Sequence, residues 1–334
     1  MHSILHPPAQ GITPLVLHKK QLHILVINVS YSHKSLHNFT KLESWFHWGA
    51  GIMKGQKRKL SHTLIDKKLK KLQQILKEMG SILVAYSGGV DSTFLLKVAK
   101  DAVDDQVLAV TATSPTYPRR EEQAARRMAK TLKVRHKNIK TNELDCADFK
   151  GNPPNRCYYC KRELFSKLKP LAQKGGYQFI VEGSNRDDEK DFRPGLKAVK
   201  ELGIRSPLQE AGLNKEEIRQ LSKKLGLSTF DKPSFACLSS RFPYGQSIDL
   251  KKLRMVDRGE AYLHTLHFKQ ARVRYHGSIA RIEVVPEDID QFQDPKVRQA
   301  VIKRFKQLGF TYITLDLQGF RSGSMNEQLP SKHT

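Results

Sequence analysis

The sequence predicts an α/β protein in which a doubly wound parallel sheet is followed by a smaller α+β domain. Short apolar runs alternate with amphipathic segments from residue 65 to 225, which is the order that gives a parallel sheet with crossover helices. A glycine-rich turn joins the first apolar run directly to the first crossover helix. After residue 246 the order changes to helix, strand, turn, strand, helix, strand, typical of a small unit with a hairpin. A chain of 334 residues is long enough for about two such domains.

Residues 1–52 differ in composition from the rest of the chain. They hold seven of the 13 histidines, both tryptophans, a single acidic residue (Glu43) and no arginine. They also show no sustained helical or strand period. We therefore expect a dispensable or disordered extension, with Met53 as the true start.

The first domain is predicted over residues 53–230. Its opening helix is amphipathic and basic, because Ile65, Leu69, Leu72 and Leu76 recur at helical spacing among lysines. The short apolar runs that follow are typical of strands buried on both faces. The predicted elements are helix 65–79, strand 82–85, helix 93–100, strand 107–111, helix 120–132, helix 162–174, strand 179–182 and helix 215–225.

The second domain is predicted over residues 231–327, with a tail over 328–334. A His276-Gly277 turn separates two β-branched runs and predicts a hairpin. The predicted elements are helix 250–266, strand 271–275, strand 280–285, helix 295–308 and strand 311–317.

The composition limits the classes of function. The net charge of +25 favours anionic partners without separating nucleic acid from small phosphorylated substrates. No apolar run approaches the roughly 20 residues of a membrane span, so we expect no membrane contact. Four cysteines are too few for a disulfide framework in a chain of this length. We therefore expect a cytoplasmic protein.

The turn between the first strand and the first crossover helix has the composition of a phosphate-binding loop. Its glycines permit a tight turn with successive N–H groups exposed, and the helix N-terminus adds a positive dipole end. The loop has no lysine of the Walker type, so chemistry at the α-phosphate is favoured over γ-phosphate transfer. Asp91 is expected to bind Mg²⁺ or to cap the helix. The candidate ATP and Mg²⁺ residues of the loop are Ser87, Gly88, Gly89, Asp91 and Ser92.

Three of the four cysteines form a second candidate site. Cys157 and Cys160 make a C-x-x-C just before a predicted helix, and Cys237 lies far along the chain. A structural zinc site requires four ligands, whereas three thiolates on a [4Fe-4S] cluster leave one iron open to sulfide or substrate. A dithiol redox pair and a set of inert buried thiols are the alternatives. Cys146 has no predicted role.

The glycine-rich loop resembles the SGGxDS loop of ATP pyrophosphatases, which cleave ATP between the α- and β-phosphates to adenylylate a substrate. The resemblance places adenine beside Thr113, after the strand 107–111, and matches a later strand-end loop to residues 182–188. It implies ATP and Mg²⁺ as ligands. The acidic residues at 187, 188, 189 and 191 are either a solvated loop or a metal or substrate site.

Four further segments resemble the LarE family over about residues 60–327. They are residues 152–161, 191–198, 239–245 and 316–323. The family adenylylates a carboxylate of pyridinium-3,5-biscarboxylic acid mononucleotide and converts it to a thiocarboxylate for a nickel-pincer cofactor. The C-x-x-C with a third cysteine resembles the members that carry a [4Fe-4S] cluster on Cys157, Cys160 and Cys237. Other members sacrifice the sulfur of one cysteine, and for this chain that alternative falls on Cys237.

Arginines of the second domain form a third candidate site. Arg272 and Arg274 alternate on a predicted strand and so point the same way. The family resemblance places the substrate phosphate at Ser240, Arg272 and Arg321, while a solvated basic face is the alternative.

The predicted function is therefore ATP-dependent sulfur insertion by an ATP-pyrophosphatase-type sulfurtransferase. We expect a small anionic pyridinium mononucleotide as partner in place of nucleic acid, and a homo-oligomer. A tRNA 2-thiolation enzyme with the same loop and an iron–sulfur cluster is the first alternative. A non-catalytic nucleic-acid-binding protein with a structural metal site is the second.

Overall fold

The computed structural model describes residues 63–189, 193–233, 236–321 and 323–328. The predicted extension at residues 1–52, Asp191 and residues 329–334 of the predicted tail lie outside the described residues. The domain boundaries at 52, 230 and 327, the homo-oligomer and the cytoplasmic location stay predictions.

The first sheet has four strands in the order β3-β2-β1-β4, and every pairing in it is parallel. Its strands are β1 (Ile82–Ala85), β2 (Val107–Thr113), β3 (Arg135–Lys140) and β4 (Phe179–Val181). Because all four strands run the same way, the residues that follow them meet at one carboxyl edge, where open α/β sheets bind ligands.

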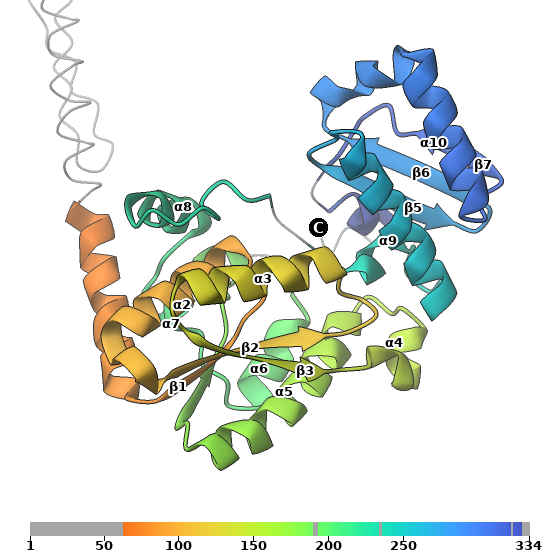
Figure 1. Ribbon diagram of the computed structural model, residues 1–334. Coiled ribbons are helices and arrows are strands. Elements are labelled where there is room, and N and C mark those ends of the chain that lie inside the picture. The colour runs from red at the N-terminus through yellow and green to blue at the C-terminus, as the bar shows by residue number, and fades with distance from the viewer. Residues whose placement is uncertain (1–62, 190–192, 234–235, 322, 329–334) are drawn as a thin grey trace, which may run out of the picture. The chain divides into compact units, whose positions relative to one another are not determined.

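Helices cover both faces of this sheet (Figure 1). Ile82 and Val84 of β1 belong to one apolar core and Leu83, between them, belongs to another, because successive strand side chains point to opposite faces. The first core includes side chains of the helix over residues 63–79, α2 (Val90–Val103), α3 (Arg119–Thr131), α7 (Pro207–Glu210) and α8 (Lys215–Lys224). The second includes side chains of α5 (Arg156–Gly175) and α6 (Gly195–Glu201). The predicted doubly wound α/β fold is confirmed.

A second, three-stranded sheet has the order β5-β6-β7. The antiparallel hairpin of β5 (Ala271–His276) and β6 (Ile279–Val284) surrounds the predicted turn, and β7 (Tyr312–Leu315) pairs in parallel with β6. Helices α9 (Leu250–Thr265) and α10 (Pro295–Gln307) pack on this sheet through a third apolar core. The short elements are α4 (Ala147–Lys150), η1 (Asp104–Gln106), η2 (Glu143–Asp145), η3 (Arg186–Glu189), η4 (Leu238–Arg241), η5 (Pro286–Gln293) and η6 (Ser324–Gln328).

Short helices α4, α6 and α7 were not among the expected elements, and three further differences concern the sheet edge and the candidate sites. Strand β3 was not expected, because the polar run Arg135–Lys140 forms an edge strand that buries little apolar surface. Helix α5 begins at Arg156 and not near 162, so the C-x-x-C lies inside its first turn. Helix α2 begins at Val90, directly after the two loop glycines.

A membrane-spanning helix needs about 20 predominantly apolar residues. No helix within residues 63–189, 193–233, 236–321 and 323–328 is long and apolar enough to cross a bilayer.

Candidate active site

The loop at residues 87–92 lies at the carboxyl end of β1 and opens α2, as predicted. Gly88 has a φ of +67°, and a Cβ there would lie 2.7 Å from the Ala125 Cβ of α3, so the position requires glycine. Ser87 Oγ and Ser92 Oγ lie 3.0 Å apart across the turn. The N-cap of α2 is Gly89, which has no side chain to cap the helix. N–H groups of the first turn are therefore left for an anionic ligand.

The segment that follows β4 forms the opposite wall of the loop. A Cβ at Gly183 would lie 3.1 Å from the Ser92 backbone nitrogen, so glycine allows the two backbones to approach. Asn185 Nδ2 donates to Asp91 Oδ1 at 3.3 Å. Burial raises the pKa of Asp188, and the negative charge of Asp91 raises it further. Two acidic side chains therefore lie close enough to repel each other, a situation that a divalent cation relieves.

Two lysines from distant segments contact the loop, and sequence reasoning missed both. Lys215 Nζ, from the first turn of α8, forms an ion pair with Asp91, and its backbone N–H donates to Asp187 Oδ2 at 2.9 Å. Lys232 Nζ donates to Gly88 O at 3.0 Å and lies 2.7 Å from Glu121 Oε2. The loop contains no lysine, and the tertiary fold places these two lysines against it. No local motif marks them, because they lie 124 and 144 positions away from their partners.

Thr113 ends β2, the strand beside β1, on the carboxyl edge that also carries the loop. Two residues earlier, the Thr111 hydroxyl donates to Tyr86 O at 2.8 Å, immediately before the loop. Thr113 itself accepts a backbone hydrogen bond from Thr141 N at 3.1 Å. The predicted position beside the loop is consistent with an adenine contact.

The structure also brings Cys157, Cys160 and Cys237 together, and we call them the three-cysteine group. Cys157 and Cys160 lie one turn apart at the start of α5, and Cys237 is the N-cap of η4. Burial raises the pKa of Cys157, and the nearby Cys237 raises it further. Burial also raises the pKa of Cys160, as do the charges of Glu143, Cys237 and Cys157. All three are free thiols.

A hydrogen-bonded clamp joins the two segments that carry these thiols. Asn152 is fully buried, and its side-chain amide donates to Phe242 O at 3.3 Å and to Pro243 O at 2.7 Å. Its backbone carbonyl accepts from Gly245 N at 3.0 Å. This Asn152 clamp explains why two separate motifs of the sequence are needed for one site.

The arrangement of the thiols bears on metal binding. Across the described part of the chain, no three cysteine, histidine, aspartate or glutamate side chains are arranged as a metal site. The three thiols are therefore close enough to affect one another electrostatically without forming a complete ligand set. Cys146 is a partly buried thiol that packs against the core of the second sheet.

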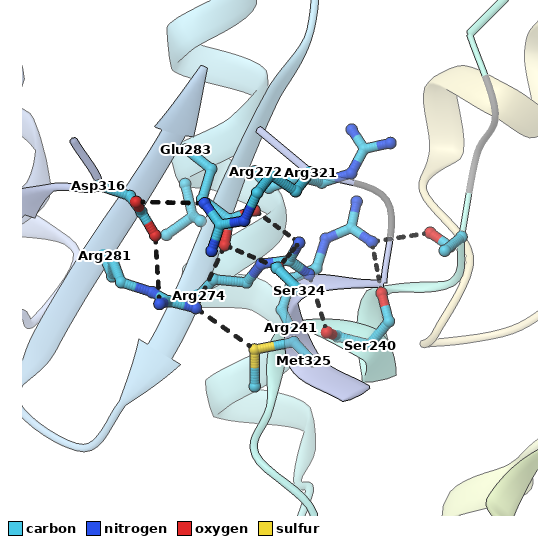
Figure 2. Close-up of polar contacts among 12 residues, drawn as sticks. Ser240, Arg241, Arg272, Arg274, Arg281, Glu283, Asp316, Arg321, Ser324 and Met325 are labelled. Carbon is cyan, nitrogen blue, oxygen red and sulfur yellow. Dashed lines mark hydrogen bonds and ion pairs between the residues drawn. The ribbon is translucent and has the colours of Figure 1, made fainter. Parts of the chain in front are cut away.

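The predicted arginine site lies within a network of buried ion pairs on the second sheet (Figure 2). Arg241 and Glu260 are fully buried and pair at 2.7 and 2.9 Å. Arg241 also donates to Ser240 Oγ at 2.8 Å and to Cys237 O at 3.2 Å. The network therefore fixes the backbone next to the third cysteine.

Arg272 and Arg274 are both buried, which overturns the alternative of a solvated basic face. Arg274 pairs with Glu283 at 2.6 Å and donates to Ser240 O at 3.0 Å. The Arg272 guanidinium lies 5.2 Å from the centre of the Phe320 ring, next to Arg321. Burial lowers the pKa of Arg272 to about 10, and the charges of Arg241, Arg274 and Arg120 contribute to the decrease.

Arg321 takes part in the same network. It lies 3.5 Å from Asp316 Oδ1 and 3.2 Å from Glu327 Oε1. Its position after β7 agrees with the prediction. Arg274, which the family resemblance does not assign to the substrate phosphate, connects Ser240 to the sheet.

A basic pocket of about 220 Å³ lies between Arg272 and the loop-contacting Lys232. Its lining residues are Arg120, Glu121, Lys232, Pro233, His264, Lys269, Gln270 and Arg272. Four of these are cationic and one is acidic, so the pocket is suited to an anion. A larger pocket of about 400 Å³ on the second sheet is lined mainly by apolar side chains of η5, α10 and β7 and contains none of the predicted site residues.

Comparison with known proteins places these sites in a family. The NAD synthase family profile matches residues 64–155, which include the loop and α2. An uncharacterized protein of Synechocystis is 45% identical over 266 residues, covering 80% of this chain and 99% of the relative. The pyridinium-3,5-bisthiocarboxylic acid mononucleotide synthase of Lactiplantibacillus plantarum is 40% identical over 268 residues, covering 80% of this chain and 96% of the synthase.

The chain belongs to the LarE family. A match of 268 residues is longer than the predicted first domain, so the LarE likeness extends beyond the ATP-binding part of the chain. The GMP synthase of Aeropyrum pernix is 26% identical over 174 residues, covering 47% of this chain and 34% of that enzyme. This shorter match agrees with an α/β domain of the ATP pyrophosphatase type within LarE.

Proposed function

We propose that this LarE-family protein is an ATP-dependent sulfur transferase that acts on pyridinium-3,5-biscarboxylic acid mononucleotide. It adenylylates one substrate carboxylate, releasing pyrophosphate, and then replaces the adenylate with sulfur to give a thiocarboxylate. The observation that carries the proposal is 40% identity to a named synthase along 96% of its length. The loop, the three-cysteine group and the arginine network supply the three chemical functions that this reaction requires.

Activation takes place at the loop. The phosphates of ATP occupy the N–H groups at the start of α2, and Asp91 is the carboxylate placed to hold Mg²⁺. The substrate carboxylate attacks the α-phosphorus, the bond to the bridging oxygen breaks, and pyrophosphate leaves with the electron pair. Lys215 and Lys232 are positioned to neutralise the departing pyrophosphate, since both contact the loop.

The substrate phosphate binds among Ser240, Arg272 and Arg321. Three other arginines crowd Arg272 and lower its pKa, so a bound anion relieves repulsion that the empty network contains. The basic pocket between Arg272 and Lys232 extends from this position toward the loop. A mononucleotide held by its phosphate can therefore present its ring carboxylate toward ATP.

Sulfur transfer completes the reaction. A sulfur anion attacks the acyl carbon of the adenylate, the carbon–oxygen bond breaks, and AMP leaves with the electron pair. Cys157, Cys160 and Cys237 are the residues that would hold a [4Fe-4S] cluster, which would supply an iron able to bind sulfide. Their thiols match the donor type of such a cluster and act on one another's pKa, while the described side chains are not arranged as a complete metal site. Arg156, Lys161 and Arg193 supply positive charge beside Cys157. The sacrificial use of Cys237 is the alternative source of sulfur.

The proposal is tested by incubating the anaerobic protein with ATP, Mg²⁺, sulfide and the pyridinium mononucleotide. We expect AMP and pyrophosphate in equal amounts, with a product in which sulfur replaces oxygen, identified by mass spectrometry. Asp91→Asn is expected to remove both products while leaving the circular dichroism spectrum unchanged, because Asp91 is partly exposed in the first turn of α2. ADP and phosphate as products would contradict the proposal.

A further inference from the structure

Arg156 is a buried cation whose hydrogen-bonding capacity is only partly used. It is the first residue of α5 and only 6% of its surface is exposed. Its Nε and Nη1 atoms are buried without a hydrogen-bond partner in the described structure. A buried guanidinium with unused donors is costly, since the group has lost its hydration without replacing it. In native proteins such a group calls for a specific explanation, and a bound ion or ligand is one of the recognised ones.

The surroundings of Arg156 point to the three-cysteine group. One face of the guanidinium lies 4.8 Å from the centre of the Tyr244 ring. Burial acts to lower the pKa of Arg156, but Cys237, Cys157 and Tyr244 together outweigh it and the pKa is raised. The guanidinium therefore lies near two thiols that come from different segments of the chain.

Other positive groups converge on the same point. Helix α5 has 20 residues, and its N-cap, Asn155, makes no side-chain cap hydrogen bond, so the positive end of the helix dipole faces the thiols. Lys161 and Arg193 also act on Cys157. Both already have ion-pair partners, Glu182 at 2.6 Å and Asp188 at 2.9 Å. Arg156 differs from them in having two buried donors without a partner.

We propose that Arg156 binds the sulfur anion that is to be transferred, donating to it from Nε and Nη1 beside the three-cysteine group. The inference rests on the proposed function and assigns a binding residue for its sulfur substrate, with hydrosulfide as the simplest form. A singly charged, polarisable anion suits a position beside a guanidinium and polarisable sulfur atoms. A phosphate already has its own arginines on the second sheet. By favouring the anion over its protonated form, Arg156 keeps the sulfur nucleophilic.

The test compares Arg156→Met and Arg156→Lys with Arg219→Met. Arg219 is the matched control, because it is a partly buried arginine with both terminal nitrogens bonded, to Phe230 O at 2.6 Å and Lys232 O at 2.8 Å. Thermal melting of the anaerobic full-length proteins is measured with and without sodium hydrosulfide. The KM for sulfide is measured in turnover, and adenylylation is followed separately as exchange between ATP and labelled pyrophosphate.

We expect Arg156→Met to melt at or above the wild-type temperature without sulfide, because the substitution removes unsatisfied buried donors. Sulfide should raise the melting temperature of the wild type but not of Arg156→Met. The KM for sulfide should rise about tenfold or more, and about tenfold corresponds to ~1.4 kcal/mol. Arg219→Met should lower the melting temperature and leave the sulfide KM unchanged.

A merely structural arginine gives the opposite pattern. If water bridges Arg156 to the unpaired acceptor Asn152 Oδ1, Arg156→Met melts lower, as Arg219→Met does, with an unchanged sulfide KM, and the proposal is overturned. If Arg156→Met does not fold, the sulfide KM of Arg156→Lys decides, because lysine keeps the charge and loses the planar set of N–H donors. A raised KM supports the proposal, and an unchanged KM overturns it. A wild-type protein that makes no AMP and pyrophosphate would instead overturn the proposed function itself.

Discussion

Replacing Glu260 with glutamine tests how much the buried ion pair beside the third cysteine stabilises the folded protein. Glu260 and Arg241 are both fully buried, and the Val273 backbone N–H also donates a hydrogen bond to Glu260 Oε1 at 3.1 Å. Burial acts to raise the pKa of Glu260, but Arg241 outweighs it and lowers the pKa from 4.5 to about 2. That decrease corresponds to roughly 3 kcal/mol of stability, in line with the ~3–5 kcal/mol lost when one partner of a buried pair is removed.

The assay is urea unfolding of the wild type and Glu260→Gln between pH 3 and pH 7, about the range over which Glu260 titrates in the unfolded chain. A depressed folded-state pKa contributes stability that is present above the unfolded value of 4.5 and lost as the pH falls toward 2. We therefore expect a difference of about 3 kcal/mol at neutral pH that shrinks below pH 4.5. Glu163→Gln is the control, because its exposed pair with Lys167 contributes less than about 1 kcal/mol. A difference under ~1 kcal/mol, or one independent of pH, would refute the reasoning.

Four further predictions follow from the sites. Lys215→Met should slow ATP cleavage about 10²-fold, as removal of a group that stabilises developing charge does, while Lys224→Met on the exposed side of α8 should not change the rate. Alanine at Cys157, Cys160 or Cys237 should remove a broad absorption near ~400 nm and sulfur transfer while adenylylation survives; a colourless, active protein that loses ~34 Da in turnover would instead show sacrificial sulfur donation. A chain starting at Met53 should keep full activity in the same assay. Incubation with tRNA at physiological salt should yield no thiolated base by nucleoside mass spectrometry. Thiolation would show that the positive net charge of the protein binds RNA as a substrate.

The parts of the fold that depend on apolar periodicity were predictable. Strands β1 and β2 are buried on both faces and appear in the sequence as apolar runs, and α10 begins at the expected Pro295. Strand β3 was missed because an edge strand needs only one neighbour, so the polar run Arg135–Lys140 can pair without being apolar. The start of α5 was placed too late because the cysteines and tyrosines of its first turn have no helical signature of their own.

The sites were predictable where one short segment carries the chemistry. The loop at residues 87–92 combines glycines, hydroxyls and a helix N-terminus within six positions. Lys215 and Lys232 were not predictable, because they are two of 58 basic residues and only tertiary folding brings them to Asp91 and Gly88. The role of Arg156 depends on burial and on unsatisfied donors, neither of which the order of residues reveals.

The Asn152 clamp also determines when the three-cysteine group can form. Cys157 and Cys237 are 80 positions apart, and closing a loop of that length carries an entropic cost that local structure near either cysteine does not offset. The clamp is completed only when the backbone of Phe242, Pro243 and Gly245 has joined Asn152. During synthesis the C-x-x-C therefore emerges long before its third partner, as an ordinary pair of thiols. The three-cysteine group is complete only after the segment that carries Cys237 has folded against Asn152, so a chain that ends before residue 237 lacks the third thiol.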